Sequence, residues 1–121
     1  MNLIDTRTHG FLDYAMGLLL IACPFLFALS GDGAESIILY ILGSGAILYS
    51  LFTDYELGVV KKLPMNLHLC LDIFSGILLA VSPWLFAFAG RTFLPHVILG
   101  VIEIAAAFAT NTGKHSSTRL I

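Results

Sequence analysis

Histidine and aspartate stand four residues apart at two places in this sequence, His9 with Asp13 and His68 with Asp72. On a helix, residues at i and i+4 lie on one face, so each imidazole can contact the carboxylate that follows it. Imidazole and carboxylate groups placed together can bind a divalent metal, relay protons or hydrogen-bond to each other. The spacing therefore predicts two His–Asp pairs, provided that both segments are helical.

Long uncharged segments follow both pairs. Residues 14–31, 36–53 and 73–90 contain no charged residue, and residues 92–113 contain only Glu103. Each segment is close to the ~17–25 residues that a helix needs to cross a ~30 Å hydrocarbon core. Hydrophobic residues make up 58% of the 121 residues and charged residues 12%, against about half and a quarter in soluble proteins. The sequence therefore predicts a single all-α domain, a polytopic membrane bundle of four helices.

The two His–Asp pairs belong to an internal repeat, with one unit at about 7–54 and the other at about 66–111. In the first helix of each unit, histidine, aspartate, proline and two glycines stand at matching positions. In the second helix the matches include Gly43 with Gly100 and Thr53 with Thr110. Because a unit with an even number of spans repeats in the same orientation, the halves are predicted to be related by a pseudo-twofold axis along the membrane normal.

A short motif lies late in the first helix of each unit. The second unit has the tripeptide Ser82, Pro83 and Trp84, and the first unit has Cys23, Pro24 and Phe25. A two-helix unit with this tripeptide resembles the SPW-repeat family of small bacterial and archaeal integral membrane proteins, although the first unit keeps only the proline. The resemblance implies the repeated four-span fold and no reaction. Both prolines are expected to kink their helices about two turns before the outer end.

Glu103 is predicted to lie at the same membrane depth as Asp13 and Asp72. Because a carboxylate is costly against lipid, all three are expected to point into the bundle. The sequence therefore predicts one polar or ion-binding cluster in a single leaflet, formed by His9, Asp13, His68, Asp72 and Glu103. The other half of the bundle is expected to be almost wholly apolar, with His96 near that membrane interface.

Three interpretations of this cluster stay open. In the first, each histidine donates to its own aspartate and the pairs fix the register of the bundle. In the second, the imidazoles and carboxylates bind a divalent ion such as zinc, manganese or iron. In the third, the carboxylates relay protons or cations within a transporter or channel. The first is favoured, so no metal and no cofactor are expected.

The sequence contains no G-x-S-x-G, phosphate-binding or haem-binding motif. It also lacks the basic patch with interleaved aromatic residues that is typical of nucleic-acid binding. We therefore expect a structural or interaction membrane protein without catalysis, with a proton- or cation-coupled transporter or channel component as the alternative. Bilayer lipid and further copies of the chain are the expected partners, because four short spans bury little surface.

Basic residues predict the orientation. Five of them fall on one side of the four predicted spans and only Arg91 on the other; the five are Arg7, Lys61, Lys62, Lys114 and Arg119. Loops rich in lysine and arginine stay in the cytoplasm. Both termini are therefore expected to be cytoplasmic, in the cell membrane of a prokaryote.

Overall fold

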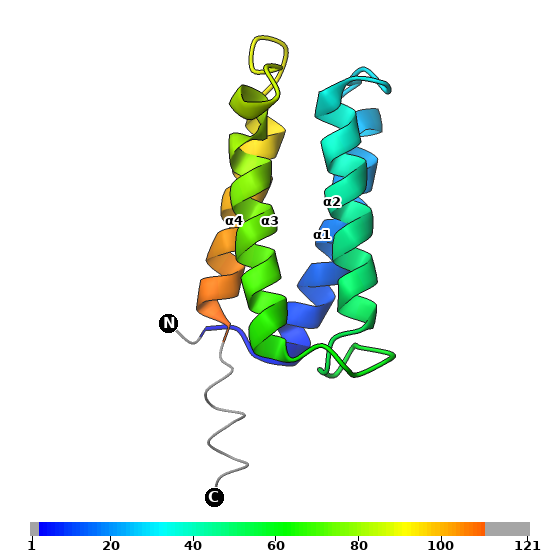
Figure 1. The fold of residues 1–121 in the computed structure, drawn as a ribbon, viewed down its shortest axis with the longest axis vertical. Helices are drawn as coiled ribbons and strands as arrows, with labels where there is room; N and C mark the ends of the chain where they lie inside the picture. The colour runs from blue at the N-terminus through cyan, green and yellow to red at the C-terminus, as the bar shows by residue number, and fades with distance from the viewer. Residues whose placement is uncertain (1–2, 111–121) are drawn as a thin grey trace, which may run out of the picture.

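A computed structural model describes residues 3–110 of the chain. Its helices are α1 (Thr6–Leu26), α2 (Ala34–Leu51), α3 (Met65–Leu85) and α4 (Leu94–Ala109). They form two helical hairpins, α1 with α2 and α3 with α4, which lie side by side (Figure 1). Contact is most extensive within each hairpin, and between hairpins α2 contacts α3 more than α1 contacts α4. The predicted all-α four-helix bundle is confirmed.

The bundle has two different ends. The proximal end, which is the lower end in Figure 1, holds the start of α1, residues 52–64 and the end of α4. The distal end holds the two turns at 27–33 and 86–93. Backbone hydrogen bonds tie the proximal end together: the Leu3 and Ile4 N–H groups donate to the Ala109 carbonyl at 2.9 and 3.0 Å.

The helices and their outer surface fit a membrane. Helices α1, α2 and α3, with 21, 18 and 21 residues, are long and apolar enough to cross one. Helix α4 is shorter than predicted, at 16 residues, which is about 24 Å at 1.5 Å per residue. Large apolar side chains point outward, among them Phe25, Phe74 and Phe108. Because such a surface is stable against lipid rather than water, the chain is a membrane protein.

Glycine pairs bring the two helices of each hairpin close together. A Cβ atom placed on Gly43 would lie 2.8 Å from the backbone oxygen of Gly17, and one on Gly100 would lie 2.6 Å from that of Gly76. Membrane helices without a hydrophobic drive between them gain stability from such close packing. The glycines that match between the repeat units therefore form the contact point of each hairpin.

The first helix of each unit ends earlier than predicted, at Leu26 and at Leu85. Pro24 and Pro83 consequently lie in the last helical turn, and the prediction that they lie about two turns before the end is wrong. Beyond each helix an alanine has a left-handed backbone, Ala28 with φ 51° and Ala87 with φ 60°. In this type of cap the chain turns back across the helix end, and here the proline carbonyl accepts the closing hydrogen bond. An uncharged run shows that a segment can lie in lipid, but it does not show that the whole segment is helical. The uncharged segments therefore predicted longer helices than the structure has.

Candidate functional site

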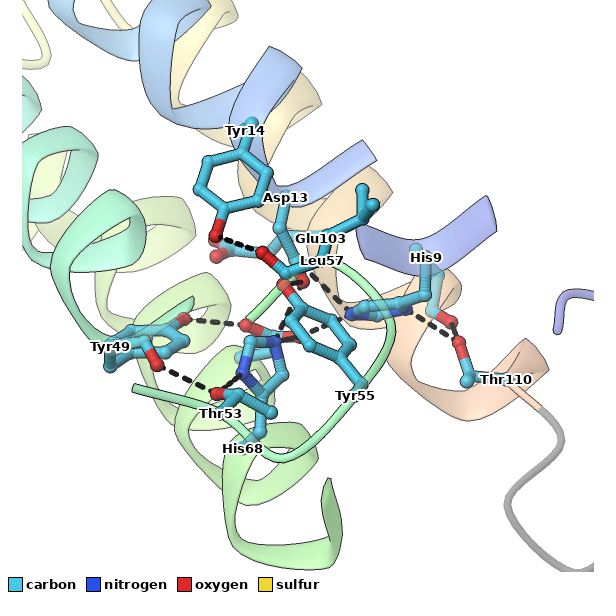
Figure 2. Close-up of polar contacts among 12 residues, drawn as sticks. His9, Asp13, Tyr14, Tyr49, Thr53, Tyr55, Leu57, His68, Glu103 and Thr110 are labelled. Carbon is cyan, nitrogen blue, oxygen red and sulfur yellow. Dashed lines mark hydrogen bonds and ion pairs between the residues drawn. The ribbon is translucent and has the colours of Figure 1, made fainter. Parts of the chain in front are cut away.

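The two His–Asp pairs meet at the proximal end, between α1 and α3 (Figure 2). The Nε2 atom of His9 lies 3.0 Å from Asp13 and 2.7 Å from Asp72. The Nε2 atom of His68 lies 2.9 Å from Asp13 and 3.2 Å from Asp72. Each imidazole therefore contacts both carboxylates, and the contact across to the other helix is the shorter one in each case. Both predicted contacts within a helix are present, and the structure adds a contact from each histidine to the aspartate of the other helix.

The other ring nitrogen of each imidazole, Nδ1, forms a hydrogen bond with a threonine hydroxyl from the other repeat unit. His9 Nδ1 lies 2.6 Å from Thr110 Oγ1, and His68 Nδ1 lies 2.6 Å from Thr53 Oγ1. Each hydroxyl donates its hydrogen to the backbone carbonyl four residues earlier, at 2.7 Å for Thr53 and 2.6 Å for Thr110. A hydroxyl has one hydrogen, so each threonine must accept from the imidazole N–H. Both Nδ1 atoms therefore carry a hydrogen, and both Nε2 atoms face the carboxylates.

Tyrosines bind the carboxylates and close the proximal side of the site. The Tyr49 hydroxyl donates to Asp72 Oδ1 at 2.5 Å, and the Tyr55 hydroxyl donates to Asp13 Oδ2 at 2.7 Å. Burial and the nearby Asp13 carboxylate raise the pKa of Tyr55 well above its ordinary value, so its phenol stays protonated and donates. The loop 52–64 that carries Tyr55 is held against α1 by a 2.8 Å hydrogen bond from Tyr14 to the Leu57 carbonyl.

A cavity of about 240 Å³ lies beside the site, between α1 and α4. His9, Asp13, Asp72 and Glu103 line it, together with apolar side chains. Glu103 Oε2 accepts from the Ser75 hydroxyl at 2.9 Å, and its Oε1 is buried without a hydrogen-bond partner. Glu103 therefore shares this cavity with His9, Asp13 and Asp72, but it pairs with none of them.

The distal half contains a second polar group, and the expectation of an almost wholly apolar half is wrong. Glu35 is 2% exposed and accepts two hydrogen bonds from the Arg91 guanidinium, at 3.0 and 2.8 Å. This carboxylate raises the pKa of Arg91. His96, expected at the interface, is fully buried with Nε2 2.9 Å from the Glu35 carbonyl oxygen. No pattern in the sequence predicts this contact, because the partners lie in separate hairpins.

The repeat motif has a packing role in the structure. Cys23, Ser82 and both prolines are buried, whereas Phe25 and Trp84 are 75% and 60% exposed on the lipid-facing surface. The Ser82 hydroxyl donates to the backbone oxygen of Leu79 at 2.7 Å. The motif therefore contributes small buried residues at the helix end and an aromatic anchor outside, and none of its side chains reaches the His–Asp site.

No curated protein and no solved structure matches the chain. The model of one protein family, described as the SPW repeat domain, matches residues 7–110. The match spans all four helices and includes both His–Asp pairs, both threonines and Glu103. It confirms the resemblance seen in the tripeptide at 82–84, and the chain belongs to the SPW repeat family.

Proposed function

We propose that the protein is a non-catalytic membrane protein that binds a cation at the His–Asp site, as a component of a cation-coupled transporter or channel. The observation that carries this proposal is the cavity between α1 and α4. The carboxylates of Asp13, Asp72 and Glu103 line this cavity inside an apolar bundle. Glu103 Oε1 is buried there with no hydrogen-bond donor. An unpaired buried carboxylate oxygen is unfavourable by several kcal/mol unless the group takes up a proton or another cation approaches it.

The charges around the cavity do not balance. If Asp13, Asp72 and Glu103 are ionised, two charged imidazoles still leave one negative charge in excess. Within residues 3–110 the only lysine or arginine in an ion pair is Arg91, and its partner is the distal Glu35. In that ionisation state the excess negative charge attracts a mobile cation.

Two neighbouring cavities support access to the site from the distal end. A second cavity, of about 920 Å³, lies among the distal turns and is lined by Glu35 and Arg91. Leu19 and Leu99 line both cavities, so the two adjoin at these side chains. The proximal side is covered by Tyr55 and the loop 52–64. Access to the site is therefore proposed from the distal face.

Flux measurements in proteoliposomes test this function. Vesicles that contain the protein and a dye sensitive to H⁺, Na⁺ or Zn²⁺ are expected to take up at least one of these cations faster than protein-free vesicles. Glu103→Gln is expected to slow that uptake several-fold, because it removes the unpaired carboxylate. The matched control Glu56→Gln changes an exposed proximal carboxylate that binds Thr6 and lies outside the cavity. Vesicles that take up none of the three cations would contradict the transport function and support a structural role.

We also propose that the proximal end faces the cytoplasm of a prokaryotic cell, because Arg7, Lys61 and Lys62 lie at that end. Lys114 and Arg119, which entered the same prediction, lie outside the described residues. In a variant whose own cysteines are replaced by alanine, Gly33→Cys is expected to react with a membrane-impermeant thiol reagent added to intact cells, and Lys61→Cys is expected to stay protected. The opposite pattern would reverse the orientation. Self-association and the absence of a nucleic-acid partner stay proposals from the sequence.

A further inference from the structure

We propose that the site binds one divalent first-row transition-metal ion through Nε2 of His9, Nε2 of His68 and one carboxylate oxygen each from Asp13 and Asp72. This inference rests on the proposed cation binding and names the cation. It departs from the expectation that hydrogen bonds alone hold the site.

The four side chains place their ligand atoms close together. One ligand atom from each residue lies within 4.8 Å of the other three, and all four residues are buried. Metal–ligand bonds of about 2.0–2.2 Å place tetrahedral ligands about 3.4 Å apart. The observed nitrogen–oxygen distances of 2.7–3.2 Å would need to open by about 0.2–0.7 Å, and ligand atoms as much as 4.8 Å apart would need to close by about 1.4 Å, to reach this tetrahedral spacing.

The position of the hydrogen atom on each imidazole favours metal binding at Nε2. Because Thr53 and Thr110 fix a hydrogen on both Nδ1 atoms, a neutral imidazole presents its Nε2 lone pair to the carboxylate oxygens. His68 Nε2 lies 2.9 Å from Asp13 and 3.2 Å from Asp72, and two lone pairs at such distances repel each other unless Nε2 carries a second hydrogen. A cation between nitrogen and oxygen turns this repulsion into two bonds. A fixed N–H on the outer nitrogen is also the usual arrangement for a metal-binding histidine.

Charge and ligand type indicate which ion fits. Two neutral imidazoles and two carboxylates carry two negative charges, so one divalent ion makes the buried site neutral. A mixed nitrogen and oxygen ligand set suits zinc, iron, cobalt or manganese, whereas calcium and magnesium prefer oxygen ligands alone. The tyrosines help to orient the ligands: Tyr49 binds Asp72 Oδ1, which leaves Oδ2 as the oxygen that faces both imidazoles.

Cobalt titration of the full-length protein tests the site directly. The protein in detergent is treated with a chelator, dialysed and titrated with Co²⁺, whose visible absorption reports bound ligands. We expect one equivalent of Co²⁺ per chain, displaced by Zn²⁺ and not by excess Mg²⁺ or Ca²⁺. Absence of the cobalt bands from wild-type protein that keeps its helical circular dichroism would overturn the inference.

Substitutions of single residues test which side chains bind the metal. His68→Gln and Asp72→Asn are each expected to abolish stoichiometric Co²⁺ binding, and Thr53→Val is expected to weaken it about 10–100-fold through the orientation of His68. The matched control Glu56→Gln, an exposed carboxylate outside the cavity, is expected to keep one equivalent bound. If Glu103→Gln and not Asp72→Asn removed the metal, the assigned ligand set would be wrong.

The experiments can contradict the proposed transport function and the proposed metal site independently of each other. Uptake of H⁺ or Na⁺ by the vesicles, without Co²⁺ or Zn²⁺ binding by the protein, would leave the proposed function standing and overturn the metal site. One tightly bound metal without flux of any tested cation would support the metal site and contradict the transport function.

Discussion

Asp72→Leu is expected to lower the free energy of unfolding by about 3–5 kcal/mol, as breaking a buried ion pair from one side commonly does. Asp72 is 2% exposed and contacts His9, His68 and Tyr49. Its removal deprives the Tyr49 hydroxyl of its acceptor and leaves Asp13 as the remaining carboxylate partner of both imidazoles, whereas a partnership with His68 alone would predict about 1–3 kcal/mol. Reversible denaturation of the chelator-treated protein in detergent, followed by circular dichroism, measures the change.

Asp54→Leu is the matched control for this measurement. Asp54 also lies at the proximal end, but it is exposed and stands in the loop 52–64. Its replacement is expected to change the free energy of unfolding by about 0.5 kcal/mol or less, as at most surface positions. A cost below about 1 kcal/mol for Asp72→Leu, or an equal cost for both variants, would show that the cluster does not hold the hairpins together.

Gly43→Ala and Gly100→Ala are each expected to lower the free energy of unfolding by about 1–3 kcal/mol, the usual cost of overpacking. The added methyl group would lie 2.8 Å from the Gly17 backbone oxygen in the first case and 2.6 Å from the Gly76 backbone oxygen in the second. Real Cβ atoms essentially never approach another atom so closely. Because the obstructing atom belongs to a helix backbone, the two helices of the hairpin must move apart.

Gly45→Ala separates this packing effect from the helix propensity of glycine. Gly45 lies in the same helix as Gly43, and a Cβ atom there has no neighbour within 4 Å. Its replacement is expected to raise the free energy of unfolding by about 0.5–1 kcal/mol, since alanine loses less conformational freedom than glycine in a helix. The two variants on α2 should therefore change stability in opposite directions. A gain for Gly43→Ala would contradict the close contact between α1 and α2.

The sequence by itself determined the fold class and the local part of the site. A run of about 20 uncharged residues reflects the thickness of a bilayer, so it predicts a spanning helix without knowledge of its neighbours. The four-residue spacing of His9 and Asp13 places them on one helix face for the same local reason. The repeat also matched Thr53 with Thr110, the two residues that prove to orient the imidazoles.

Only the tertiary structure decided which groups meet across the bundle. The contact of His9 with Asp72 joins residues 63 positions apart, and that with Thr110 joins residues 101 positions apart. The binding of Arg91 to Glu35 and the cavity beside Glu103 likewise depend on how the two hairpins lie against each other. Helix periodicity sets the direction of a side chain within one helix, but the docking of two hairpins depends on the packing of all their facing side chains at once. For that reason the sequence predicted the two pairs and their gathering into one cluster, and only the structure showed which groups contact each other across the helices.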